Sequence, residues 1–174
     1  MRRAVLASML IIGLIGTGTA AADQATPFKA TIDAVTTPLA PTPDCPIFLQ
    51  SDQSGEATHL GRYVGTGTTC GFNFRVVEEP PFNPGGEPPY FVADFINEET
   101  LTAANGDQLF VTSHGVRVES LPDGTSGNRG EATIHGGTGR FEGATGQAFG
   151  GRDADEEVNR IEGWIHYHAS NASS

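Results

Sequence analysis

Residues 135–146 have the sequence HGGTGRFEGATG, in which five of twelve residues are glycine and Phe141 is the one aromatic side chain. A phosphate-binding loop would need Lys followed by Ser or Thr after the last glycine, and a helix beyond it. A dinucleotide-binding turn also needs a following helix. Here the chain continues as QAFGG, without lysine and in an extended pattern. The glycines therefore predict a corner between two strands, with Phe141 turned inward.

The rest of the chain has a β pattern. No long segment repeats apolar residues at helical spacing, and Gly, Pro and Asn-Gly signals interrupt the extended runs. We expect about eight strands, at residues 28–35, 46–50, 57–77, 90–103, 107–119, 129–136, 147–152 and 158–169. Gly65 and Gly67 mark the place where the third of these would break. Residues 78–89 contain five prolines and predict a loop that is ordered by its own packing or serves as a lid.

Strand alternation predicts which side chains share a face. In the third strand Cys70 is expected to point with the aromatic residues, on a face made by Val64, Cys70, Phe72, Phe74 and Val76. In the last strand a mostly apolar face opposes a polar one, the first made by Ile161, Gly163, Ile165, Tyr167 and Ala169 and the second by Arg160, Glu162, Trp164, His166 and His168.

Residues 90–96 are largely apolar on both faces, with Tyr90, Val92 and Ile96 on one side and Phe91, Ala93 and Phe95 on the other. A strand of this kind lies at the centre of a closed or sandwiched structure. An antiparallel barrel of about eight strands removes exposed sheet edges and is the predicted all-β fold. A β-sandwich is the alternative.

Three segments of the sequence carry a family resemblance. The first, Gly136-Gly137-Thr138-Gly139-x-Phe141 with Gly146 five residues further on, resembles the hallmark corner of the allene oxide cyclase/dirigent-like β-barrel superfamily. Residues 57–68 (ATHLGRYVGTGT) and 101–110 (LTAANGDQLF) resemble companion segments in its bacterial secreted members.

This resemblance implies an eight-stranded antiparallel barrel, a homotrimer and a site in the barrel mouth. Plant relatives cyclise an allene oxide or steer the coupling of phenoxy radicals, and some bacterial relatives are cyclases in polyketide pathways. Catalytic residues cannot be carried over, because the resemblance lies in turn-forming segments. The signal-peptide pattern of residues 1–22 and the pair Cys45 and Cys70 depart from the intracellular bacterial cyclases.

The N-terminus predicts export. Arg2 and Arg3 precede an apolar run at residues 4–15, and small residues lead to a cleavage site after Ala22. The run is shorter than the roughly 20 residues needed to span a bilayer. We therefore expect a signal peptide at residues 1–22, and a secreted, extracellular protein without a membrane anchor after cleavage.

Cleavage would leave eight basic against 21 acidic residues and change the formal net charge from −11 to −13. Phosphate binding needs clustered Lys and Arg, so nucleic acid is excluded as a partner. The remaining chain suits one domain at residues 23–169, followed by a flexible tail at 170–174. In an exported protein, Cys45 and Cys70 predict a disulfide, since a zinc site would need about four ligands.

Asp94 is the candidate acid or base, because it lies between Ala93 and Phe95 in an apolar strand. The alternatives are a carboxylate paired with an arginine or a hydroxyl, or a polar-lined lumen. The candidate ligand-binding residues are aromatic: Tyr63, Tyr90, Phe91, Phe95 and Tyr167.

Two groups of residues offer alternatives as metal sites. His166 and His168 share one side of a strand, and an acidic run contains Asp153, Asp155 and Glu156. Solvated surface explains both better, since the histidines share a polar face and the acidic run lacks a calcium-loop motif. We expect no metal and no cofactor.

Three functions remain open. The first is binding of an apolar or aromatic small molecule in the barrel. The second is a cofactor-independent cyclase or isomerase that controls the conformation of its substrate. The third is a non-catalytic surface or structural protein with a filled barrel. Barrels of about eight strands are compatible with all three.

Overall fold

The computed structural model describes residues 25–167. The predicted signal peptide at 1–22, the tail at 170–174, His168 and Ala169 lie outside the described residues.

Eight antiparallel strands are hydrogen-bonded in one closed ring. Each strand pairs with its neighbours in sequence, and β1 closes the ring by pairing with β8. The predicted all-β barrel is confirmed, and the β-sandwich alternative is wrong because one ring contains every described strand. The strands are β1 (Thr26–Pro38), β2 (Ile47–Ala57), β3 (Gly61–Val77), β4 (Tyr90–Ala103), β5 (Gln108–Ser120), β6 (Ser126–Gly137), β7 (Thr145–Arg152) and β8 (Asn159–His166).

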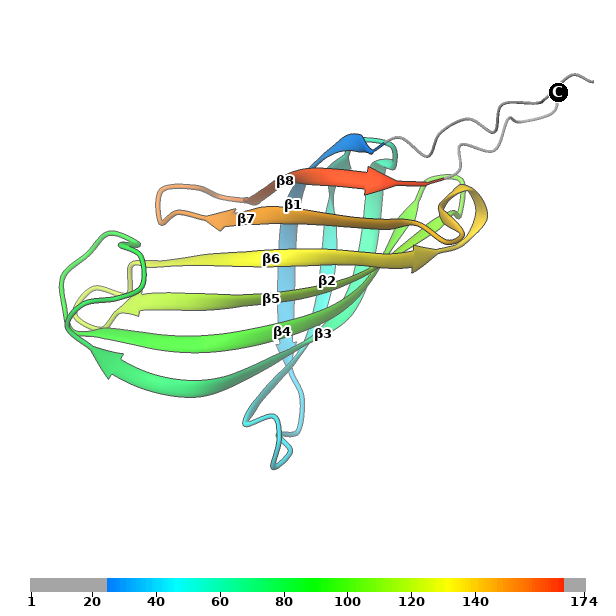
Figure 1. Cartoon of the computed structure of the whole chain (residues 1–174). Helices are drawn as coiled ribbons and strands as arrows, with labels where there is room; N and C mark the ends of the chain where they lie inside the picture. Colours follow the sequence, from blue (N-terminus) through cyan, green and yellow to red (C-terminus); the bar gives the residue numbers. More distant parts are fainter. Residues whose placement is uncertain (1–24, 168–174) are drawn as a thin grey trace, which may run out of the picture.

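The ring is barrel-like but not evenly round. Strands β4–β8 lie side by side across the view in Figure 1, whereas β1 and β2 pass behind them at a steep angle. The closing ladder runs from the pair Thr26–Ile165 to the pair Ile32–Asn159. Beyond Ile32, β1 pairs with β2 alone. The edge of β1 that faces β8 therefore has no partner strand beyond Ile32.

The glycine-rich corner closes one end of the barrel. After β6, the short 3-10 turn η1 (Gly139–Phe141) leads into β7. The side chain of Phe141 is fully buried at this end. It belongs to the main core cluster, together with residues that include Phe28, Leu60, Tyr63, Leu109, Ile134, Ala144 and Ile165. The corner thus acts as a plug for this end of the ring.

Two glycines of the corner have a clear physical role. Gly139 has φ +59°, a left-handed conformation that side chains disfavour, and a Cβ there would overlap the carboxylate of Asp107. A Cβ at Gly137 would overlap the carbonyl oxygen of Gln108 and lie 2.6 Å from the Cβ of Phe141. The glycines therefore let the backbone approach its neighbours closely rather than bind a phosphate.

A β-bulge in β3 reverses part of the predicted alternation. The register with β4 shifts between Phe72 and Arg75, and Asn73 has φ +53°. Gly71 and Phe74 both line the barrel interior, although they are three positions apart and regular alternation would put them on opposite faces. The prediction that Cys70 and Phe74 share a face is therefore wrong, because the extra residue turns Phe74 inward and leaves Cys70 outside.

The proline-rich segment 78–89 packs on the outer face of the sheet. Phe82 contacts the buried cluster of Tyr90, Val92 and Val118, and the guanidinium of Arg129 lies 5.1 Å from the centre of its ring. In Figure 1 this segment forms the green loop at the ends of β3 and β4. No residue of the segment lines the interior cavity. Of the two predicted roles, packing is observed and a lid over the interior is not.

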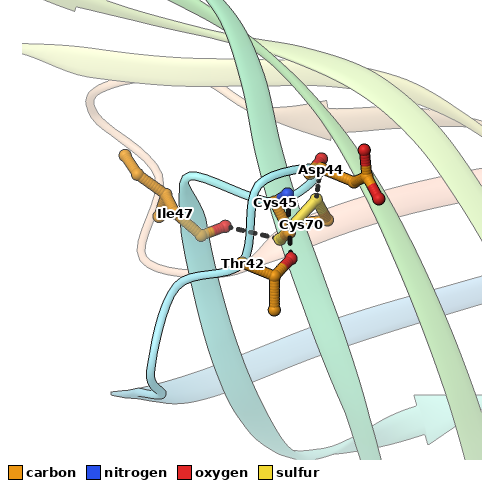
Figure 2. The surroundings of a disulfide bond; sticks show 5 residues. All are labelled: Thr42, Asp44, Cys45, Ile47 and Cys70. Carbon is orange, nitrogen blue, oxygen red and sulfur yellow. Dashed lines mark hydrogen bonds between the residues drawn. A yellow bond between two sulfur atoms is a disulfide. The ribbon is translucent and has the colours of Figure 1, made fainter.

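A disulfide joins Cys45 to Cys70, as predicted, with 5.3 Å between the Cα atoms. Figure 2 shows that it ties the β1–β2 connection to β3. The backbone N–H of Cys45 also donates to Oγ1 of Thr42, at 3.1 Å. The bond anchors the segment from which β2 starts, and Ile47 at that start lines the interior.

Candidate functional site

The barrel encloses a cavity of about 580 Å³. Phe28 and Ile134 line it near the corner. At the opposite end it is lined by Thr36, Arg117 and Asn159, which lie near the strand ends that are far from the corner. We call this opposite end the mouth. The side chains thus leave an interior space of the size that small-molecule sites occupy.

Apolar side chains make up most of the cavity wall. The rings of Phe74 and Phe91 stack near the mouth, with their centres 5.7 Å apart. Further aromatic and aliphatic residues line the wall, among them Leu49, Phe95, Leu101, Val111 and Ile161. Such a wall favours an apolar or aromatic ligand, because burial of both surfaces removes them from water.

A set of three polar side chains interrupts this apolar wall deep in the cavity. Glu99 on β4 accepts a hydrogen bond from Nε2 of Gln53 on β2. The same nitrogen lies 3.4 Å from Oγ of Ser51, to which it donates. Ser51 and Gln53 are buried, with 3% and 7% of their surface exposed. We call Ser51, Gln53 and Glu99 the floor cluster, and all three line the cavity.

The glycines of β3 bring the floor cluster together. Strand β3 lies between β2 and β4, and Gly67 pairs with Ser51 on one side and with Glu99 on the other. Because Gly67 has no side chain, nothing on β3 separates the two neighbouring strands there. A Cβ on Gly67 would lie 2.9 Å from Cγ of Glu99. The pairing of β3 with both neighbours continues through Gly65 and Gly67, so the break predicted there from the sequence is absent.

Glu99 is a carboxyl in an unfavourable environment for its charge. Burial raises the pKa of Glu99, and the hydrogen bond from Gln53 opposes that shift in part. Within residues 25–167, no Lys, Arg or His forms an ion pair with Glu99. Desolvation without a countercharge favours the protonated form. A carboxyl of this kind can exchange a proton with, or hold a donor group of, a bound molecule.

Tyr63 lies beneath the floor cluster and belongs to the core. Its hydroxyl donates to the carbonyl oxygen of Thr31, at 3.0 Å. The pKa of Tyr63 is raised far above its ordinary value, first by burial and then by the charge of Glu99. The hydroxyl therefore stays protonated and already committed to the backbone, so it supports the floor rather than reacting.

The cavity is short of hydrogen-bond donors. Gln53, Asn97 and Asn159 line it, and the side-chain oxygen of each is buried without a partner among the described residues. Buried oxygens normally accept at least one hydrogen bond. These buried oxygens, at the mouth and deeper in the cavity, are thus complementary to a ligand that donates hydrogen bonds.

The sequence candidates are distributed over different parts of the molecule. Phe91 and Phe95 line the cavity. Asp94 borders it as well, but its carboxylate accepts hydrogen bonds from Nη1 of Arg75 and Nδ2 of Asn73, each at 3.1 Å. This arrangement matches the expected alternative in which an arginine partners the carboxylate.

The other two tyrosines lie away from the cavity. Tyr90 is buried under the proline-rich segment, and its hydroxyl donates to the carbonyl oxygen of Gly86 at 3.0 Å. Tyr167 packs against Phe141 at the corner end, with the ring centres 5.3 Å apart. Its hydroxyl is hydrogen-bonded to Nδ1 of His59, at 3.0 Å. Neither residue lines the interior.

The two alternative metal sites have other contacts. His166 packs edge-on against the exposed Trp164, 5.0 Å between ring centres. In the acidic run, Asp153 pairs with Arg129 and Glu156 with Arg160. Within the described part of the chain, no group of three His, Cys, Asp or Glu side chains is placed to hold a metal ion.

The sequence interpretation missed the floor cluster. The prediction of a strand at 90–103 with Phe91, Ala93 and Phe95 on one face contained the necessary signal, because continued alternation places Glu99 on that face. Gln53 had no such signal. The residues around it, SDQSGEA, are polar or small and lack the apolar alternation of a strand, although they form most of β2.

Comparison of the chain with protein-family models, with curated proteins and with solved structures finds no match. No helix among residues 25–167 is long and apolar enough to cross a membrane.

Proposed function

We propose that this protein is a secreted β-barrel that binds an apolar or aromatic small molecule in its interior. The observation that carries the proposal is the cavity of about 580 Å³, with mostly apolar walls and a few convergent polar groups at its floor. This combination is the usual form of a small-molecule site. The proposed secretion is supported by the signal-peptide pattern of residues 1–22 and agrees with the disulfide.

We also propose that the chain is a divergent bacterial secreted relative of the allene oxide cyclase/dirigent-like barrels, and a homotrimer. The sequence of the corner, the ring of eight antiparallel strands and a cavity reached from the barrel mouth support this relationship. The open interior weighs against the third hypothesis, a filled barrel that acts through its surface.

Glu99 favours one alternative function. A carboxyl whose pKa is raised by burial, facing an apolar cavity, is suited to proton transfer. A cofactor-independent cyclase or isomerase would use the walls to hold the substrate in one conformation and Glu99 to donate or accept a proton. Asp94 is less suited to this role, because Arg75 and Asn73 already hold its carboxylate.

A mouth-blocking variant tests the binding proposal. Ala34 on β1 lines the cavity, whereas its neighbour Val35 is 68% exposed and lies outside it. We expect the wild type to bind the neutral apolar dye Nile red saturably, with a rise in fluorescence. Ala34→Trp should weaken this binding about tenfold or more, equivalent to about 1.4 kcal/mol. Val35→Trp, which adds the same ring outside, should leave it unchanged.

Two results would overturn the binding proposal. The first is the absence of saturable Nile red binding by the wild type. An equal effect of the two tryptophans would place the dye on the surface and would also overturn it.

A further inference from the structure

The carboxylates that line the cavity differ in how their charge is balanced. Asp94 pairs with Arg75 at 3.1 Å, and Glu119 pairs with Arg117 at 2.9 Å near the mouth. Glu131 is exposed to solvent and accepts a hydrogen bond from Gln147 at 3.3 Å. Glu99 is the one deep carboxyl, and no cation contacts it among the described residues.

The fold has already removed most of the water from Glu99. The main obstacle to a buried ion pair is the desolvation of both partners. Here the cost for the carboxyl is part of the folded state, as the raised pKa of Glu99 reflects. A cation that enters the cavity therefore loses only its own hydration, while the low-dielectric walls strengthen its attraction to the carboxylate.

The hydrogen bonds around Glu99 also favour a cation. Gln53, which is 7% exposed, uses its Nε2 on Glu99 and Ser51, and its Oε1 has no donor among the described residues. The buried Oδ1 of Asn97 also lacks one. An ammonium group has three donors and no acceptor. It would supply what the floor lacks, whereas a carboxylate ligand would add further acceptors.

We propose that the cavity takes a lipophilic organic cation, whose ammonium group lies against Glu99 and whose apolar body lies along the aromatic wall. The proposal rests on the proposed binding function and names its ligand class. A ligand anion would meet a lining with four carboxylates and one guanidinium, namely Asp94, Glu99, Glu119, Glu131 and Arg117. A neutral apolar ligand would make no ion pair with the one deep carboxyl of the lining.

Three probes of one shape test the charge preference. They are 1-naphthylmethylamine, 1-naphthylmethanol and 1-naphthoic acid, and the amine is protonated at about pH 7.5. Calorimetric titration of the wild type should give an affinity for the amine about tenfold or more above that for the alcohol. The acid should bind more weakly than the alcohol.

Two variants locate the effect. Glu99→Gln should weaken binding of the amine about tenfold or more and change binding of the alcohol less than about threefold. Glu98→Gln removes the same charge at the neighbouring exposed position, which does not line the cavity, and should leave both affinities unchanged. The ranking of the three probes on the wild type needs no variant.

Each failure is distinguishable. If none of the three probes binds, the proposed function falls, and this inference falls with it. If the probes bind but the amine shows no preference over the alcohol, the inference alone is overturned. Equal losses of amine affinity in the two variants would show a general field effect and would also overturn the contact with Glu99.

Discussion

Gln53 and Glu99 contact each other across β3, although they belong to strands that are not neighbours in the ring. The contact exists because Gly65 and Gly67 present no side chains to the interior between β2 and β4. A glycine pair that suggests a strand break in the sequence thus creates the polar floor of the cavity.

Gly67→Ala should destabilise the fold. The new Cβ would overlap the carbonyl oxygen of Glu98 and press on Cγ of Glu99. We expect a loss of about 1–3 kcal/mol in the free energy of unfolding, measured by urea denaturation. Gly136→Ala is the control, since its Cβ would meet only Cδ2 of Phe110 at an ordinary 3.5 Å. Equal losses for the two variants would contradict the role assigned to Gly67.

Glu99→Gln should stabilise the protein at neutral pH. Because burial raises the pKa of Glu99 above 4.5, the folded state holds this proton more tightly than the unfolded state does. The stability contributed by the protonated carboxyl is fully present below the unfolded pKa and is lost as the pH rises through the folded pKa. The amide carries no charge and avoids this loss, so the variant should gain about 1 kcal/mol near neutral pH.

The pH dependence of this gain is the decisive measurement. Thermal unfolding should show a difference from the wild type that shrinks toward about pH 4, where the unfolded carboxyl becomes protonated. Glu98→Gln, on the exposed face of the same strand, should show no such pH-dependent gain. A gain that grows toward low pH would have the wrong sign and would refute the raised pKa.

Phe141→Ala should remove the plug at the corner end. Its side chain is fully buried, and truncation of a buried Phe costs about 3–5 kcal/mol. Phe149→Ala is the matched control, because Phe149 on β7 is 54% exposed. Its loss should stay near 0.5 kcal/mol, the usual range for surface positions. Comparable losses in chemical denaturation would show that the corner does not close the core.

Cys45→Ser combined with Cys70→Ser should lower stability without changing the fold. The disulfide joins residues 25 apart in sequence, and a loop of this length corresponds to roughly 3–4 kcal/mol in the chain-entropy treatment. Denaturation of the double variant and of the reduced wild type should agree. Reduction that leaves the unfolding midpoint unchanged would show that the bond adds nothing to stability.

Much of the fold follows from local pattern. The hairpin signal at Asn105-Gly106 and the glycines around Phe141 correctly located connections, because turn chemistry is short-range. The strand predicted at 90–103 matches β4. Both faces of β4 are apolar near its start because each is covered, one by the cavity and the other by the proline-rich segment. Phe91 and Phe95 line the cavity, while Val92 lies under the proline-rich segment.

The site was less accessible from the sequence because it depends on non-local geometry. Gln53 belongs to a strand without apolar alternation, so it offered no β signal. The inward turn of Phe74 depends on a bulge at Asn73, which the alternation rule does not anticipate. The apolar neighbours of Asp94 in sequence predict a pocket acid or base, whereas its partner Arg75 comes from the adjacent strand. Of the floor cluster, only Glu99 had a signal in the sequence, because continued alternation from Phe91 and Phe95 places it on the same face, but the sequence interpretation did not include it.

Native mass spectrometry of the protein, purified from its own organism without refolding, is the measurement to make first. We expect the folded protein to carry a discrete added mass that denaturation removes, or to take up one 1-naphthylmethylamine per chain when this probe is added. The same spectrum would distinguish a trimer from a monomer. A folded protein that shows the bare-chain mass both before and after addition of the probe would contradict a ligand-binding interior.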